Sequence, residues 1–157
     1  MNAFTIRASL ATLLFLATAS GFSQAAWADD TLYRDFGEKP GLERIVDDLV
    51  TNLHADPRTS PYFVGAPEKR IKEKLVEQLC VLLDGPCVYT GRTMKRSHEG
   101  IGVTRAAFYA LVEDMQRAMD KNNVPFRSQN KLLAKLAPMY RDIEDHDEEP
   151  HHAANAQ

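Results

Sequence analysis

His98 is the histidine whose place in the sequence best suits metal chemistry. Three others, His146, His151 and His152, lie in the polar C-terminal tail, and His54 lies at the end of an apolar-striped segment. His98 instead lies in a glycine-rich stretch that must pack between longer helices. A histidine there is either a loop residue hydrogen-bonded to the backbone or, as a neutral imidazole, an axial ligand of haem iron. Its position alone leaves both interpretations open.

The two cysteines, Cys80 and Cys87, are the next residues that could do chemistry. They form neither a C-x-x-C nor a C-x-x-C-H motif, so covalent haem attachment of the cytochrome c kind is not supported. An even cysteine count favours a disulfide in an oxidising compartment. Two free thiols, one of them buried in a helix, are the alternative.

The first long helix that must position these residues is predicted between Pro40-Gly41 and Asp56-Pro57, since such pairs mark helix boundaries. Its apolar residues recur every three or four positions, as one buried helix face requires. They are Leu42, Ile45, Val46, Leu49, Val50 and Leu53. A short loop over residues 60–65 follows.

A second helix is predicted to carry Pro67 in its first turn and to end at Asp84-Gly85-Pro86. Its apolar stripe consists of Ile71, Leu75, Val76, Leu79, Leu82 and Leu83. From 87 to 103 the pattern is irregular, and only a helix of one or two turns is predicted, over 94–98. His98 would lie at the end of this short helix.

Two more long helices complete the chain. Thr104 is a suitable N-cap for the third, and the fourth runs over about 127–143 with a kink or break at Pro138. The inward residues of the third are Phe108, Leu111, Val112, Met115 and Met119, and those of the fourth are Leu132, Leu133, Leu136, Tyr140 and Ile143. No run alternates as a strand would, so the predicted fold class is all-α.

The first 28 residues have the layout of a secretory signal peptide. Arg7 precedes an apolar core over 8–17, and Ala26-Trp27-Ala28 supplies an A-x-A cleavage site, with cleavage after Ala25 as the alternative. The apolar core is too short to span a bilayer comfortably, so stable membrane insertion after cleavage is not expected. We therefore expect a signal peptide over 1–28, one domain over 29–144, a disordered acidic and histidine-containing tail over 145–157, and a periplasmic or secreted location.

Charge argues against nucleic acid as a partner. The 157 residues include 19 Lys and Arg against 22 Asp and Glu, which gives a net charge of -3. A nucleic-acid-binding protein usually has a basic excess or a basic stripe.

Short motifs along the chain, in this order and spacing, together resemble the group I truncated haemoglobins, or two-over-two globins. The resemblance covers about 32–143. The motifs are Leu32-Tyr-Arg-Asp-Phe-Gly37, Ile45-Val-Asp-Asp48, Ala55-Asp-Pro57, Tyr62-Phe63, Asp84-Gly-Pro86, Tyr89-Thr-Gly-Arg92, Met94, His98-Glu-Gly-Ile-Gly-Val-Thr104, Asn123-Val-Pro125 and Leu136-Ala-Pro138.

The resemblance implies a two-over-two helical sandwich around a non-covalent haem b, with His98 as the proximal iron ligand. It implies reversible binding of oxygen, nitric oxide or carbon monoxide, with nitric oxide dioxygenase or peroxidase-like turnover as a side activity. A cofactor-free helical interaction module is the alternative from another functional class. The implied apolar pocket consists of Phe63, Met94, Val103, Phe108, Leu111, Leu133 and Leu136, and the residues expected at the haem propionates are Tyr89, Arg92 and Lys95.

The distal side of the implied pocket departs from that family. Val50 and Leu75 occupy the positions where many members have a tyrosine and a glutamine, and Ile71 lies one turn before Leu75. None of the three can donate a hydrogen bond to bound dioxygen. Such an apolar pocket favours carbon monoxide or nitric oxide over dioxygen.

Lys74 raises an alternative function for the same site. Some relatives coordinate iron from the distal side at this position, which would give a six-coordinate Lys74/His98 iron suited to electron transfer with a donor protein. An amine must lose its proton to bind iron. Lys74 can equally extend to solvent or pair with a haem propionate. Gln78, one turn further on, is expected at the pocket rim.

Overall fold

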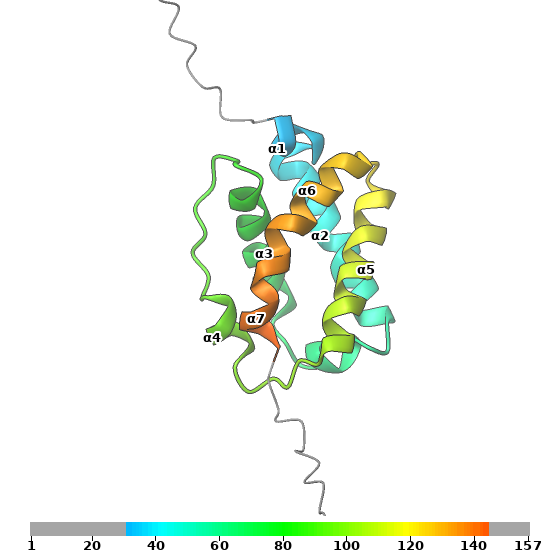
Figure 1. The fold of residues 1–157 in the computed structure, drawn as a ribbon, viewed down its shortest axis with the longest axis vertical. Helices are drawn as coiled ribbons and strands as arrows, with labels where there is room; N and C mark the ends of the chain where they lie inside the picture. The colour runs from blue at the N-terminus through cyan, green and yellow to red at the C-terminus, as the bar shows by residue number, and fades with distance from the viewer. Residues whose placement is uncertain (1–30, 145–157) are drawn as a thin grey trace, which may run out of the picture.

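The computed structural model describes residues 31–144, so the expected signal peptide and C-terminal tail lie outside the described part of the chain. The domain is helical throughout (Figure 1). In chain order the elements are α1 Thr31–Asp35, α2 Glu38–Ala55, the 3₁₀ turn η1 Ser60–Phe63, α3 Glu68–Leu82, α4 Met94–His98, α5 Arg105–Lys121, α6 Phe126–Leu136, the 3₁₀ turn η2 Ala137–Met139 and α7 Tyr140–Ile143. Residues 31–144 contain no strand, which confirms the predicted all-α class.

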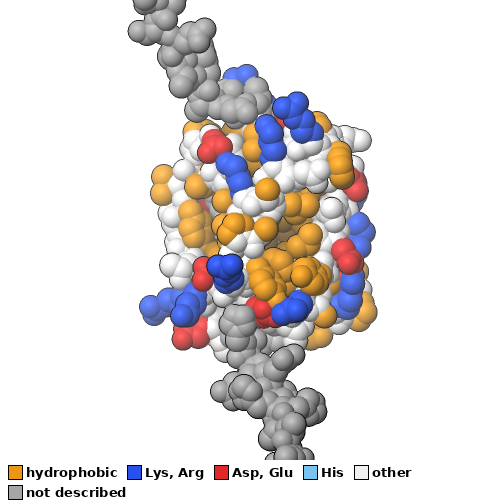
Figure 2. All heavy atoms as spheres, viewed as in Figure 1, with side chains coloured by type: hydrophobic (Ala, Val, Ile, Leu, Met, Phe, Trp, Pro, Cys, Tyr) orange, Lys and Arg blue, Asp and Glu red, His pale blue; other side chains and the backbone are white. Residues whose placement is uncertain are grey.

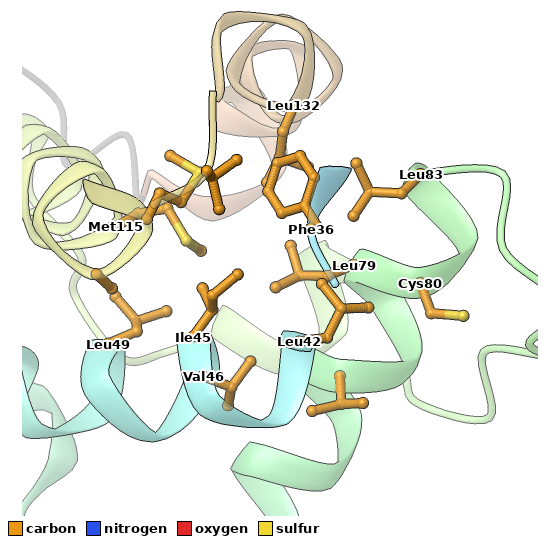
Figure 3. Packing of buried hydrophobic residues seen from close by; sticks show 14 of the residues in the cluster. Phe36, Leu42, Ile45, Val46, Leu49, Leu79, Cys80, Leu83, Met115 and Leu132 are labelled. Carbon is orange, nitrogen blue, oxygen red and sulfur yellow. The ribbon is translucent and has the colours of Figure 1, made fainter. Parts of the chain in front are cut away.

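Helix α2 is the centre of the hydrophobic core. It packs against α3 on one side and α5 on the other, while α6 packs against α5. Leu42, Ile45 and Leu49 of α2 are fully buried and meet Leu79 of α3 and Leu132 of α6 (Figure 3). All six residues of the apolar face predicted for this helix are buried. None of the helices in residues 31–144 is both long enough and apolar enough to cross a bilayer.

The start of α2 differs from the prediction. The helix begins at Glu38, so Pro40 and Gly41 lie inside its first turns rather than ahead of it. Proline is tolerated there because the first amides of a helix have no intrahelical acceptor. Gly41 is required by close packing, since a Cβ atom at this position would lie 1.9 Å from the backbone oxygen of Phe36.

The buried face of α5 also differs from the expected one. Met115 and Met119 are buried as predicted, but Phe108, Leu111 and Val112 are only half-buried. Small residues make the close contact with the core instead, namely Ala107, Ala110 and Ala118. The larger apolar side chains lie beside this contact, on the flank of the helix. Thr104 caps α5 as predicted, since its hydroxyl accepts a hydrogen bond from the backbone N–H of Ala107 at 3.2 Å.

The last predicted helix is divided at Pro138. Helix α6 ends at Leu136, η2 contains the proline, and α7 follows at once. Proline cannot donate the backbone hydrogen bond that a continuous α-helix needs, and a 3₁₀ turn replaces the α-helix at this residue. Helix α7 then packs against α4, the short helix that carries His98.

A disulfide joins Cys80 near the end of α3 to Cys87 in the segment that leads to α4, with a Cα–Cα distance of 5.9 Å. Cys80 is fully buried and Cys87 is half-buried against the core. Further along the same segment, the backbone N–H of Thr90 donates to the Glu77 carboxylate at 2.8 Å. The segment before His98 is therefore attached to α3 at two points.

Candidate functional site

A layer of half-buried apolar side chains packs against the core. It draws on η1, α3, α5 and α6, and all its members pack against the fully buried cluster while remaining partly exposed themselves. They are Phe63, Leu75, Leu82, Leu111, Leu133 and Leu136. Five of these six are residues that the sequence predicts around a haem. On one face of the molecule, hydrophobic side chains gather around a central hollow (Figure 2).

His98 is the ligand-type side chain of the site. It is half-buried at the end of α4, and its Nδ1 atom lies 2.8 Å from the backbone oxygen of Met94, one turn earlier. With Nδ1 as the donor of this hydrogen bond, the lone pair for a metal is on Nε2. A hydrogen bond of this kind fixes the plane of an imidazole that binds iron.

Backbone geometry sets the shape of α4. Thr93 precedes the helix, and its hydroxyl accepts a hydrogen bond from the backbone N–H of Arg96 at 3.3 Å. Gly100 and Gly102 follow the helix with φ angles of 74° and 73°, a conformation that favours glycine. These residues turn the chain sharply on leaving His98, so the short helix can lie against α7.

The donor set fits a haem better than a bare metal ion. Residues 31–144 contain no group of three or more His, Cys, Asp or Glu side chains close enough to hold a metal ion. A single imidazole beside an apolar layer is instead what a flat macrocycle with one protein ligand requires. Met94 is half-buried on the same helix as His98.

Val103 and Phe108 lie apart from the apolar layer. Val103 is buried at the start of α5, outside the main cluster. Phe108 is half-buried and packs edge-on against Tyr140 of α7, with 4.9 Å between ring centroids. These two residues join α5 to the part of the fold that supports α4.

Lys74 is engaged by partners on α3 and on the following segment. Its Nζ atom donates to Glu77 Oε1 at 2.7 Å and to the Thr90 hydroxyl at 2.5 Å. The hydrogen bond from Lys74, with one from the Thr90 backbone, lowers the pKa of Glu77 to about 2. Glu77 is therefore a carboxylate at neutral pH. An ammonium held this way must leave its carboxylate and lose its proton before it can bind iron.

The other distal positions offer no hydrogen-bond donor. Val50 is buried, while Ile71 and Leu75 are half-buried, and all three side chains are hydrocarbon. Gln78, which is expected at the rim of the pocket, is a polar residue on the same helix as Ile71 and Leu75. Its amide nitrogen lies 3.1 Å from the sulfur of Met94 and 3.5 Å from that of Met139, so it points across from α3 toward α4 and η2. Gln78 follows Ile71 by seven residues, so both side chains lie on one face of α3. This spacing could have predicted from the sequence that Gln78 lies beside the expected distal residues.

The residues expected at the propionates occupy the segment around α4. The Tyr89 hydroxyl donates to the backbone oxygen of Arg92 at 2.7 Å, and burial raises the pKa of Tyr89. The side chains of Arg92 and Lys95 are exposed. Two cations therefore lie within a few residues of His98 and are accessible to an anionic group.

Comparisons with known proteins agree on one family. The model described as bacterial-like globin matches residues 31–145. The chain is 31% identical over 113 residues to the group 1 truncated hemoglobin GlbN of Mycolicibacterium paratuberculosis, which covers 72% of this chain and 83% of that protein. It is 28% identical over 109 residues to GlbN of a Nostoc species, with 69% and 92% covered.

Solved structures give the same fold. The Fe(III) truncated hemoglobin of Tetrahymena pyriformis superposes with a TM-score of 0.69 at 20% identity, covering 72% of this chain and 97% of that one. The 2/2 hemoglobin of Synechococcus sp. PCC 7002, in the cyanomet state with covalently attached heme, superposes with a TM-score of 0.67 at 20% identity, covering 71% and 96%.

Proposed function

The chain belongs to the bacterial-like globin family, and from this premise we propose that His98 is the proximal ligand of a haem iron that reversibly binds oxygen, nitric oxide or carbon monoxide. Haem is the cofactor of this family of proteins. When bound, its iron supplies the coordination position that a diatomic ligand occupies. The side chains around the haem control the access of water and the preference for one ligand over another.

One observation carries the proposal, namely the orientation of the imidazole. Its Nδ1 atom is committed to the Met94 backbone oxygen at 2.8 Å, which leaves Nε2 as the metal-binding atom. The apolar layer of Phe63, Leu111 and neighbouring leucines excludes water from the macrocycle. Excluding water keeps the bound ligand from being displaced and the iron from being oxidised through solvent.

The distal residues set the ligand preference. Bound dioxygen carries more negative charge than carbon monoxide or nitric oxide, so it gains most from a hydrogen-bond donor. Val50, Ile71 and Leu75 provide none. We therefore expect dioxygen to dissociate quickly, and carbon monoxide and nitric oxide to be the favoured ligands.

Export to the periplasm or beyond the cell is part of the proposal. It is supported by the signal-peptide pattern over 1–28 and by the Cys80–Cys87 disulfide, a bond typical of oxidising compartments. The mature protein would be one globin domain ending near residue 144 with a short polar tail. Mass spectrometry of the protein secreted by an expressing cell would give the new N-terminus, which we expect at Asp29.

Haem reconstitution tests the function directly. Protein mixed with haemin should develop a Soret band, and the ferrous form should bind carbon monoxide. His98→Ala should lose the wild-type spectrum, because no other imidazole replaces it on α4. His54→Ala is the matched control, since His54 is exposed and pairs with Glu68 at 3.8 Å. An unaltered spectrum in His98→Ala, or no Soret band in the wild type, contradicts the proposal.

A further inference from the structure

Three aromatic rings, two on α5 and one on α7, form a cluster in which each ring contacts the other two, and the centroids of Phe108 and Tyr109 are 6.1 Å apart. Phe108 and Tyr140 meet edge-to-face with centroids 4.9 Å apart, and Tyr140 and Tyr109 are stacked with an interplanar angle of 4° and centroids 6.5 Å apart. Phe108 is half-buried, whereas Tyr109 is 57% exposed. The cluster thus extends from the half-buried ring of Phe108 to the exposed ring of Tyr109.

One member of the cluster belongs to the helix that supports the iron ligand. Helix α7, to which Tyr140 belongs, packs on α4, to which His98 belongs. Tyr140 therefore lies on the element next to the ligand helix. Electron transfer between aromatic side chains over such short separations needs no movement of the fold.

The hydroxyl of Tyr140 has both a donor and an acceptor beside it. Arg105 Nε donates to the Tyr140 oxygen at 3.0 Å, and the hydroxyl itself is hydrogen-bonded to the Glu144 carboxylate. Glu144 has a side chain only 11% exposed and lies 3.6 Å from the same Arg105 nitrogen. A phenol loses its proton when it gives up an electron, so a carboxylate in place to accept that proton makes the oxidation easier.

The other tyrosines have different surroundings. The Tyr89 hydroxyl donates to a backbone carbonyl, which is too weak a base to accept a proton. Tyr33 is buried under Gly85, where a Cβ atom would lie 2.7 Å from its ring. Neither ring is stacked on an exposed tyrosine in the way that Tyr140 is stacked on Tyr109.

We propose that Tyr140 and Tyr109 are an electron-donating pair which carries an oxidising equivalent from the haem to the protein surface when the oxidant is hydrogen peroxide. The inference rests on the proposed function, since it requires bound haem. Peroxide takes two electrons from the haem protein and, with two protons, becomes water. Tyr140 returns one of these electrons and passes its phenolic proton to Glu144, which leaves a neutral tyrosyl radical.

Tyr109 completes the transfer at the surface. It gives an electron to the Tyr140 radical, which takes its proton back from Glu144, while the phenolic proton of Tyr109 goes to water. Two such surface radicals from separate molecules can couple through a carbon–carbon bond between their rings, after which the hydrogen on each newly bonded ring carbon moves to the phenolic oxygen. The product is a dityrosine-linked dimer, and the second oxidising equivalent stays at the iron for an external one-electron reductant.

The experiment treats ferric, haem-loaded protein with equimolar hydrogen peroxide. Electron paramagnetic resonance of freeze-quenched samples measures the tyrosyl radical, and dityrosine fluorescence with mass analysis measures the dimer. In the wild type we expect both. Tyr140→Phe should lower the radical yield severalfold, and Tyr109→Phe should keep a radical on Tyr140 but abolish the dimer. Glu144→Gln should slow radical formation without changing the Soret band.

Tyr33→Phe is the matched control and should behave as the wild type, since Tyr33 lies in the buried core. Phenylalanine keeps each ring and its packing, and an unchanged Soret band shows that every variant is folded and loaded. Equal radical and dimer yields in wild type, Tyr140→Phe and Tyr109→Phe, with normal Soret bands, would overturn the proposed pair alone. A wild type with no Soret band would instead contradict the haem function on which the pair depends.

Discussion

The imidazole of His98 is held by the backbone oxygen of Met94, which lies 2.8 Å from its Nδ1 atom. Because the acceptor is a main-chain atom, the orientation of the ring follows from the shape of α4 and not from a neighbouring side chain. Helix α4 has five residues, so its ends decide its stability. The Thr93 cap at its start is the contact that most directly preserves this arrangement.

Removing that cap should loosen the haem. A lost N-cap costs about 1 kcal/mol, which is about a fivefold change in an equilibrium constant. We expect Thr93→Ala to release haem to a scavenging apoprotein about fivefold faster, as followed by the Soret band. Thr51→Ala is the control, since that hydroxyl donates to Asp47 on the exposed side of α2. Equal release rates for both variants would show that the cap does not support His98.

The disulfide should contribute to global stability. Replacing Cys80 and Cys87 together by serine removes a bond that closes a loop with a sequence separation of 7 residues. Chain-entropy arguments for so short a loop give a loss of about 2–3 kcal/mol in the free energy of unfolding. Denaturant unfolding of the double variant and of the oxidised wild type measures this loss. Coincident midpoints would contradict it.

A distal hydrogen-bond donor should slow dioxygen release. Leu75→Gln places an amide at a half-buried position of α3 that faces the apolar layer. One added hydrogen bond is worth about 1 kcal/mol, so dioxygen dissociation should slow about fivefold to tenfold, with little change for carbon monoxide. Val81→Gln, at an exposed position of the same helix, is the control. A similar effect on both gases would point to altered access and not to hydrogen bonding.

We expect Lys74 not to coordinate the iron while its ammonium group is hydrogen-bonded to Glu77. Its ammonium has partners at 2.7 Å and 2.5 Å, so Lys74→Ala is expected to leave the ferric absorption spectrum unchanged. Glu77→Gln removes the negative charge that pairs with the Lys74 ammonium. In this variant Lys74 could lose its proton and bind the iron, which would give a low-spin, six-coordinate spectrum. If Lys74→Ala converts a low-spin wild-type spectrum to a high-spin one, the lysine does bind iron, and electron transfer becomes the better account of the function.

Asp56 gives the domain a defined sensitivity to acid. Hydrogen bonds from Arg58 hold its pKa at about 2, below the ordinary 3.8. A carboxyl whose pKa is lower in the folded state stabilises the fold above its unfolded pKa and ceases to do so as pH falls through the folded value. The melting temperatures of the wild type and Asp56→Asn should therefore differ near neutral pH and converge between pH 3.8 and about 2. Asp142→Asn, at an exposed site, should show no such convergence.

Much of this fold follows from the spacing of apolar residues. The buried face of α2, the extent of α4 and the Thr104 cap all match the predictions. These features depend on local rules of periodicity, capping and helix termination. Helix α3 differs at both ends, since it begins at Glu68 after Pro67 and ends at Leu82, and Asp84 and not Gly85 has the left-handed conformation. The predicted start of α2 was wrong because a proline in the first turn of a helix and a proline before a helix look alike in a sequence.

The site was predicted less completely than the fold, since it depends on contacts between distant segments. The partners of Lys74 include Thr90, 16 residues away, and those of Gln78 include Met139, 61 residues away. No periodicity within α3 reports on either contact. Likewise, the aromatic cluster joins Phe108 of α5 to Tyr140 of α7, and no local pattern in the sequence reports on that contact.

The dependence of α4 on α7 has a consequence for biosynthesis. The helix that presents the iron ligand rests on residues 140–143, more than forty positions later in the chain. Residues through 143 must therefore leave the ribosome before the imidazole has its final support. We accordingly expect a chain truncated before residue 140 to bind haem more weakly than one that includes α7.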